Sequence, residues 1–256
     1  MFDIFVNQTK LLEQLGGVWI IGLLVFARTM GFTATAPLIG SKQIPALIKI
    51  SFGIVMTLII FPLVNVPSEY PRNQEFVYFI VMNAAIGMLI GWVCSLVLEI
   101  GRVAGEMLDM QMGLNAATMF DPNTQSQTTI VGHFFEFTTL VIFISVGGVE
   151  KTLEGLYKSY NTFPVVFEQI SFSLDKIIKA TAELVAIGFL VVSPIIIIIL
   201  AVDLILGLMS RAAPQINAFQ VSFSIKPTIG LLLLMLLLPT LFEIFAKLFN
   251  NPNRYF

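Results

Sequence analysis

The chain has 256 residues, of which 57% are hydrophobic and only 12% are charged, and its mean hydropathy is +0.89. Soluble domains are about 45–50% apolar and about 25% charged, so this composition predicts a membrane protein. The formal net charge of −2 offers no basic surface for a phosphate backbone, and we expect no nucleic acid among the partners.

Six apolar stretches predict helices, and they lie at about 14–35, 46–64, 76–98, 129–149, 180–209 and 227–249. Pro45 and Pro227 would sit in the first turn of a helix, where proline is tolerated. Pro62, Pro194 and Pro239 lie within or near the ends of apolar runs and should stop or bend the helices there. Kinked helices are therefore expected.

The most hydrophilic interval, residues 150–179, carries eight charges of mixed sign. It predicts a solvated connector with a short amphipathic helix. We therefore expect an all-α fold of hydrophobic, kinked helical hairpins, forming one domain over residues 1–256.

Charged residues interrupt several of the predicted helices. An arginine at the centre of a membrane helix costs about 2.5–3.5 kcal/mol on insertion, so Arg28 should face protein or water rather than lipid. Glu183 and Asp203 pose the same problem, and we expect all three charges to be buried. A charge relay in an autonomous transporter is an alternative, but 20 residues of unbroken helix would separate Glu183 from Asp203 by about 30 Å.

The third helix should continue past its apolar part with a charged stripe of Glu99, Arg102, Glu106 and Asp109. The spacing allows Arg102 to pair with Glu99 and with Glu106. We expect this face to meet water or the charges of a partner.

The segment that follows is rich in methionine. Four of the 11 methionines, Met107, Met110, Met112 and Met119, fall within 13 residues. Methionine is flexible and polarizable, so it suits adaptable surfaces, although filling a core is the alternative use. Phe120 then precedes Asp121 and Pro122, where Asp-Pro disfavours further helix. Thr128 or Thr129 can cap the next helix.

Enzymatic chemistry has few candidates. One cysteine, Cys94, and one histidine, His133, cannot complete a metal site, and His133 is better explained as a hydrogen-bonding partner of Glu136. Phosphate-binding, nucleophile-elbow and zinc-protease motifs are absent from the sequence. We expect no enzyme, no cofactor and no metal.

Three segments resemble the FliR family of flagellar biosynthetic proteins and its virulence counterparts, the T subunits of type III secretion. They are RTMGFTATAPLIGSKQIPALIK (28–49), AGEMLDMQMGLNAATMFDP (104–122) and LGLMSRAAPQINAFQVSFSIKPTIGL (206–231). The last is the most specific, and the residues that stand where the family pattern places them are Arg211, Pro214, Gln215, Asn217, Phe219, Lys226 and Gly230.

The resemblance implies a non-enzymatic subunit of the flagellar type III export gate, in the bacterial inner membrane at the basal body. Such subunits form a hetero-oligomer with FliP and FliQ, a closed pore partly raised to the periplasmic side and surrounded by membrane lipid. FlhB and FlhA are further partners, and unfolded flagellar proteins are the cargo. The chain also resembles a FliP-like part (1–176) fused to a FliQ-like part (177–256).

Carried over residue by residue, the resemblance places an inward-projecting plug of the pore at Met107, Met110, Met112, Gly113, Leu114, Met119 and Phe120. In residues 211–226, the helix break expected at Ala213-Pro214 and the polar side chains after it predict a role in subunit assembly, for which a simple loop between the last two helices is the alternative. The residues expected to take part are Arg211, Pro214, Gln215, Asn217, Phe219 and Lys226. A virulence T subunit, an autonomous transporter and a passive scaffold remain as other functions.

Overall fold

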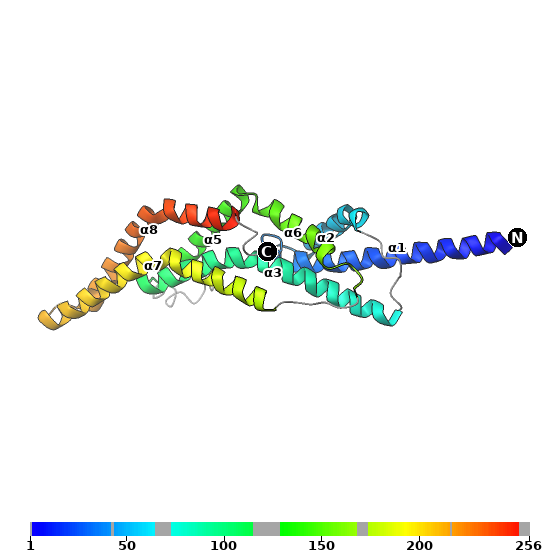
Figure 1. Cartoon of the computed structure of the whole chain (residues 1–256). Helices are drawn as coiled ribbons and strands as arrows, with labels where there is room; N and C mark the ends of the chain where they lie inside the picture. Colours follow the sequence, from blue (N-terminus) through cyan, green and yellow to red (C-terminus); the bar gives the residue numbers. More distant parts are fainter. Residues whose placement is uncertain are drawn as a thin grey trace. The chain divides into compact units, whose positions relative to one another are not determined.

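A computed structural model describes residues 2–41, 44–64, 73–114, 129–167, 174–215 and 217–250 (Figure 1). In chain order, its helices are α1 (Phe2–Thr35), α2 (Ala46–Ile60), the 3-10 helix η1 (Phe61–Leu63), α3 (Asn73–Met112), α5 (Ile130–Ser145), α6 (Gly148–Thr162), α7 (Leu174–Ala212) and α8 (Ala218–Asn250). These described ranges contain no strand, and the predicted all-α fold is confirmed.

Five helical stretches are long and apolar enough to cross a membrane, judged by length and composition. They are Gly17–Thr35, Ala46–Leu63, Glu75–Met112, Thr181–Ala212 and Ala218–Ile244. Helices α5 and α6 could together form a sixth span that is broken at residues 146–147. Each of the six predicted segments therefore corresponds to one of these elements. The predicted short amphipathic helix is α6.

The prolines act differently from one another. Helix α2 ends at Ile60, and Pro62 lies in η1, as a helix stop requires. Helix α7, in contrast, continues through Pro194. Helix α8 begins nine residues before Pro227, at Ala218, so the prediction that Pro227 lies in the first turn is wrong. The reason is local capping, because the Oδ1 atom of Asn217 accepts the backbone N–H of Gln220 at 3.4 Å.

The contacts divide the chain into two compact units, and each is described by itself. Unit 1 comprises residues 1–95 and 149–173, and unit 2 comprises residues 96–148 and 174–256. Helix α3 contributes to both, so the chain is not divided at a single point in its sequence. The expected junction at 176/177 concerns likeness to other subunits and stays a prediction.

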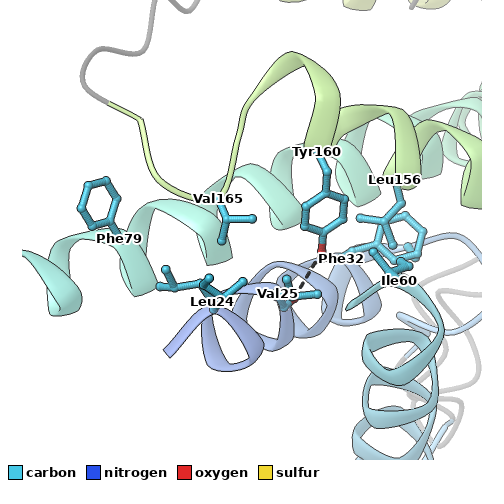
Figure 2. Packing of buried hydrophobic residues seen from close by; sticks show 10 residues of the cluster. Leu24, Val25, Phe32, Ile60, Phe79, Leu156, Tyr160 and Val165 are labelled. Carbon is cyan, nitrogen blue, oxygen red and sulfur yellow. Dashed lines mark hydrogen bonds between the residues drawn. The ribbon is translucent and has the colours of Figure 1, made fainter. Parts of the chain in front are cut away.

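The core of unit 1 is built from α1, α2, α3 and α6 with their connections, and Figure 2 shows its packing. Its buried members are Ile21, Leu24, Val25, Phe32, Ala36, Ile60, Phe79, Leu156, Tyr160 and Val165. The hydroxyl of Tyr160 donates a hydrogen bond to the carbonyl oxygen of Val25 at 3.3 Å (Figure 2). The aromatic rings of Phe79 and Phe167 meet edge to face at 5.4 Å. Sequence-distant segments are thereby held together.

Helices α1 and α3 approach each other through glycine. A Cβ atom added to Gly87 would lie 2.0 Å from the carbonyl oxygen of Arg28, and one added to Gly31 would lie 2.2 Å from that of Ala84. Such distances leave no room for a side chain. Small residues at a helix crossing permit backbone contact, a common arrangement in membrane proteins.

Unit 2 buries one side of α7, where Leu184, Val192, Ile195 and Ile199 are almost completely shielded from solvent. Much of the remaining apolar surface of α7 is exposed, including Leu190, Ile197 and Leu204. Helix α8 likewise exposes Leu232, Met235 and Leu236. A soluble monomer rarely exposes so much contiguous apolar surface, which indicates contact with lipid or other subunits.

Candidate functional sites

Arg28 lies fully buried in unit 1 and makes a dense set of hydrogen bonds. Its Nε and Nη2 atoms donate to Oδ1 of Asn83 at 3.0 and 2.6 Å, and Nη1 donates to the carbonyl oxygens of Ser159 and Phe163 at 3.1 and 2.8 Å. The guanidinium also lies 4.3 Å from the centre of the Tyr160 ring, a cation–π contact. Every acceptor described around Arg28 is uncharged.

The two carbonyl acceptors, of Ser159 and Phe163, lie at the end of α6, which terminates at Thr162. Nη2 of Arg28 adds a weaker hydrogen bond to the carbonyl oxygen of Pro164, at 3.3 Å. A helix C-terminus has unpaired carbonyl groups and a partial negative charge. The end of α6 therefore supplies the negative potential that an acidic side chain would otherwise provide.

The other two charges that we expected to be buried differ from Arg28. Glu183 is exposed on α7, so the expectation of burial does not hold for it within this chain. Asp203 is partly exposed and forms an ion pair with Lys226 of α8. The two long helices of unit 2 supply both members of this pair, which links their facing sides.

The charged stripe at the end of α3 forms the pairs that its spacing allows. Arg102 binds both Glu99 and Glu106, and all three side chains are at least partly exposed. His133 and Glu136 of α5 also lie close, with Nδ1 and Oε2 3.4 Å apart, but both side chains are about half exposed. These residues form ordinary surface pairs.

Asp109 departs from the stripe, because its side chain is fully buried. Its Oδ2 atom accepts the backbone N–H groups of Val131 and Gly132, at 2.8 and 3.1 Å. Those N–H groups belong to the first turn of α5, and N–H groups in a first turn have no hydrogen-bond acceptor within their own helix. Thr129, as predicted for the cap, also accepts the N–H of Gly132 at 3.3 Å. Two acceptors from different parts of the chain therefore cap α5.

The proposed plug residues of α3 lie in different environments. The side chain of Met110 is 67% exposed, whereas Met112 is fully buried. A Cβ added to Gly230 of α8 would meet the Cε atom of Met112 at 2.4 Å, so Met112 fills the space that this glycine leaves. Met107 is partly exposed. The placement makes Met112 a packing residue of unit 2 rather than a freely projecting one.

Helix α3 ends in a Schellman motif at Gly113. The N–H of Gly113 donates to the carbonyl of Met110 at 3.2 Å, and that of Leu114 donates to the carbonyl of Asp109 at 3.1 Å. Gly113 has a φ of 76°, the left-handed conformation that this motif requires and that favours glycine. Gly113 therefore terminates α3. Met119 and Phe120 lie outside the described residues.

The expected assembly residues surround the end of α7 and the start of α8. Arg211, Pro214, Gln215 and Asn217 are exposed. Phe219 is 72% exposed, and its ring meets that of Phe223 edge to face at 4.9 Å. Lys226 instead points to Asp203 within the same chain.

Asp109, like Glu183, is a residue that sequence reasoning placed wrongly. Its position in the stripe indicated exposure, but the nearest basic residue on α3, Arg102, lies two turns away and is already paired with two acids. An acidic residue without a partner at i±3 or i±4, one turn before a helix-ending glycine, was the available indication.

Long apolar helices, an uncharged buried environment for Arg28 and wide exposed apolar faces define a helical membrane protein that contacts other subunits or lipid. Residues 19–251 match the sequence model of the family described as "Bacterial export proteins, family 1". The chain belongs to this family. It is therefore a component of a bacterial export apparatus.

Its relatives come from two kinds of system. Flagellar biosynthetic protein FliR of Bacillus subtilis (strain 168) is 27% identical over 232 residues, which cover 89% of this chain and 90% of that protein. FliR of Aquifex aeolicus (strain VF5) is 28% identical over 246 residues, covering 90% and 95%. Surface presentation of antigens protein SpaR of Shigella flexneri is 31% identical over 183 residues, covering 71% of each chain.

Proposed function

We propose that the chain is a FliR-type subunit of the flagellar type III protein export gate. The observation that carries this proposal is the family match over residues 19–251, together with FliR relatives aligned over most of their length. The gate passes unfolded flagellar proteins across the inner membrane at the basal body. The chain acts by shaping a passage and performs no covalent chemistry.

The proposed assembly contains FliP and FliQ, with FlhB and FlhA as further partners. The wide exposed apolar faces of α7 and α8 support it, because they need lipid or protein to cover them. Residues 1–176 are proposed to resemble FliP and residues 177–256 to resemble FliQ, so that each part occupies a place like that of its counterpart. Part of the assembly is raised to the periplasmic side.

The exposed start of α8 supports the proposed assembly site. Phe219 and Phe223 form an exposed aromatic pair next to the polar groups of Gln215 and Asn217. Exposed aromatic side chains beside polar groups are typical of the centres of protein interfaces. Arg211 and Pro214 lie at the adjoining end of α7.

The segment after α3 is proposed to plug the resting pore. Met110 and Leu114 would lie at its base, with Met119 and Phe120 further along, and an exporting chain would displace them. Two features support the proposal: the concentration of methionines in this segment, and the exposure of Met110 on the last turn of α3. Flexible methionine side chains can close again around a changing occupant.

Deletion of residues 115–121 tests the plug in a strain that produces the complete export gate. The deletion should increase ion leakage across the inner membrane, and so should replacement of the same residues by seven glycines and serines. Replacement of the polar residues 123–128 in the same way is the matched control and should leave leakage unchanged. Unaltered conductance in both 115–121 variants, with the complex assembled, would refute the plug.

The identity with SpaR of Shigella flexneri favours a T subunit of a virulence system as the second candidate. Motility separates the two, because a flagellar subunit should restore swimming to a strain that lacks its own FliR. An autonomous transporter would instead move a solute when the purified chain alone is reconstituted in liposomes, and this result would refute the gate.

A further inference from the structure

We propose that Asp109 is the positioning residue that fixes the end of α3 to the start of α5 and thereby sets the place from which the plug segment departs. The inference rests on the proposed function for its consequence at the gate. Its structural part depends on described residues of α3, α5 and α8.

Two different groups of Asp109 act at the two helix ends. Its backbone carbonyl accepts the N–H of Leu114 and closes the last turn of α3. Its carboxylate oxygen Oδ2 accepts the N–H groups of Val131 and Gly132 in the first turn of α5. One residue therefore terminates one helix and caps the next, across 22 and 23 positions of sequence.

The carboxylate depends on α5 for its stabilisation. Within the described chain its second oxygen, Oδ1, is buried and accepts no hydrogen bond. Arg102, the nearest basic residue along α3, is bound to Glu99 and Glu106. What remains is the pair of N–H groups and the positive potential of the α5 N-terminus, which stabilises a negative charge. Separation of α3 from α5 would remove both at once.

The backbones next to this contact are in close approach. A Cβ added to Gly105 would lie 2.6 Å from the carbonyl oxygen of Val131, so the absence of a side chain lets α3 and α5 touch. One turn beyond Asp109 along α3, buried Met112 contacts Gly230 of α8. Asp109 lies between these two packed points, so loss of its bonds should loosen the junction between α3 and α5 while the packing at Gly105 and Met112 keeps the rest of the interface.

Thiol accessibility at Leu114 tests the inference directly. The chain has one cysteine, the buried Cys94, so Leu114→Cys in a Cys94→Ala background gives a single cysteine in this subunit, whose labelling is followed on the separated subunit. In the purified assembled complex, Asp109→Ala should increase the rate of alkylation of this thiol by about tenfold, since two charge-assisted hydrogen bonds are lost. Asp109→Asn keeps an acceptor oxygen but no charge, and should give an intermediate rate.

Thr129→Ala is the matched control. It removes an acceptor from the same N–H of Gly132, but Thr129 caps its own helix and does not join α5 to α3. Its alkylation rate should stay within about twofold of the parent complex. If Asp109→Ala prevents assembly, Asp109→Asn serves as the test variant.

Ion leakage measured in the same variants, with the native residues restored at positions 94 and 114, separates this inference from the plug. Asp109→Ala should leak, and Thr129→Ala should not. An unchanged alkylation rate for the Asp109 variants would overturn the anchoring role. Faster alkylation without leakage, in a gate where deletion of residues 115–121 does leak, would overturn the link to the plug. Faster alkylation in a gate where neither Asp109→Ala nor the deletion of residues 115–121 leaks would preserve the anchor and refute the plug itself.

Discussion

Replacement of Arg28 by methionine should destabilise unit 1 strongly. Methionine approximates the apolar stem of arginine, so the main loss is that of hydrogen-bond donors. Oδ1 of Asn83 is buried and would lose both of its donors, while its Nδ2 group would keep its bonds to the carbonyls of Phe79 and Val165 at 2.8 and 2.9 Å. The carbonyl of Phe163 would lose a donor at 2.8 Å.

The expected loss of stability comes mainly from Oδ1 of Asn83 and the carbonyl of Phe163. The carbonyls of Pro164 and Ser159 contribute less. Each buried acceptor left without a donor costs about 1–3 kcal/mol. The carbonyl of Pro164 belongs to an exposed residue and can bind water instead, and that of Ser159 keeps the N–H of Phe163 at 2.8 Å. We therefore expect a loss of about 3–5 kcal/mol, similar to the breaking of other buried charged networks.

Thermal denaturation of the purified complex measures the effect, with an expected fall in Tm on the order of 10 °C. The Tm of Arg28→Lys should lie between those of the parent complex and Arg28→Met. An ammonium group carries the charge but cannot reach Asn83 and the α6 carbonyls together, as the forked guanidinium does. Arg102→Met is the control, since its partly exposed ion pairs contribute about 1 kcal/mol or less. A Tm for Arg28→Met no lower than that of Arg102→Met would refute the reasoning.

Two further substitutions test the helix crossing and the assembly site. Gly87→Val should lower the Tm of the complex by more than about 5 °C, because its Cβ would lie 2.0 Å from a carbonyl oxygen of α1. Gly155→Ala is the control and should leave the Tm unchanged, because a Cβ at Gly155 meets nothing within 4 Å. Equal Tm values for the two variants would contradict the close crossing. Phe219→Ala should reduce co-purification with the partner subunits at least about tenfold. The chain should still insert into the membrane, because the ring is 72% exposed and contributes little packing within the chain. Recovery of the partners at the wild-type level would exclude Phe219 from the interface.

The sequence predicted the helices well where apolar runs are long, because hydrophobicity alone determines such segments. It also predicted the Arg102 pairs and the Thr129 cap, which depend on neighbours within four residues. It missed the early start of α8 at Ala218, after the cap Asn217, since a polar cap and a short mixed segment resemble a loop. Local rules therefore predicted the Arg102 pairs and the Thr129 cap, but they missed the Asn217 cap although it is also local.

The largest differences concern groups whose partners are distant in sequence. Arg28 reaches Phe163 across 135 positions, and Asp109 reaches Val131 across 22. A search for a complementary charge would fail in both cases, because both charges are stabilised by helix ends. The sequence gives the sign of a charge but not the location of a helix terminus that can receive it.

The signs of these two contacts agree with the polarity of the helices. Arg28 lies at carbonyl groups beyond the end of α6, and Asp109 lies at N–H groups in the first turn of α5. A cation at a helix C-terminus and an anion at a helix N-terminus are the two favourable combinations. Exchange of either sign would place a buried charge against a like partial charge, so Arg28→Glu and Asp109→Lys should damage the fold more than the neutral variants do. An equal effect of neutral and reversed charges would show that packing, rather than the helix termini, stabilises these two positions.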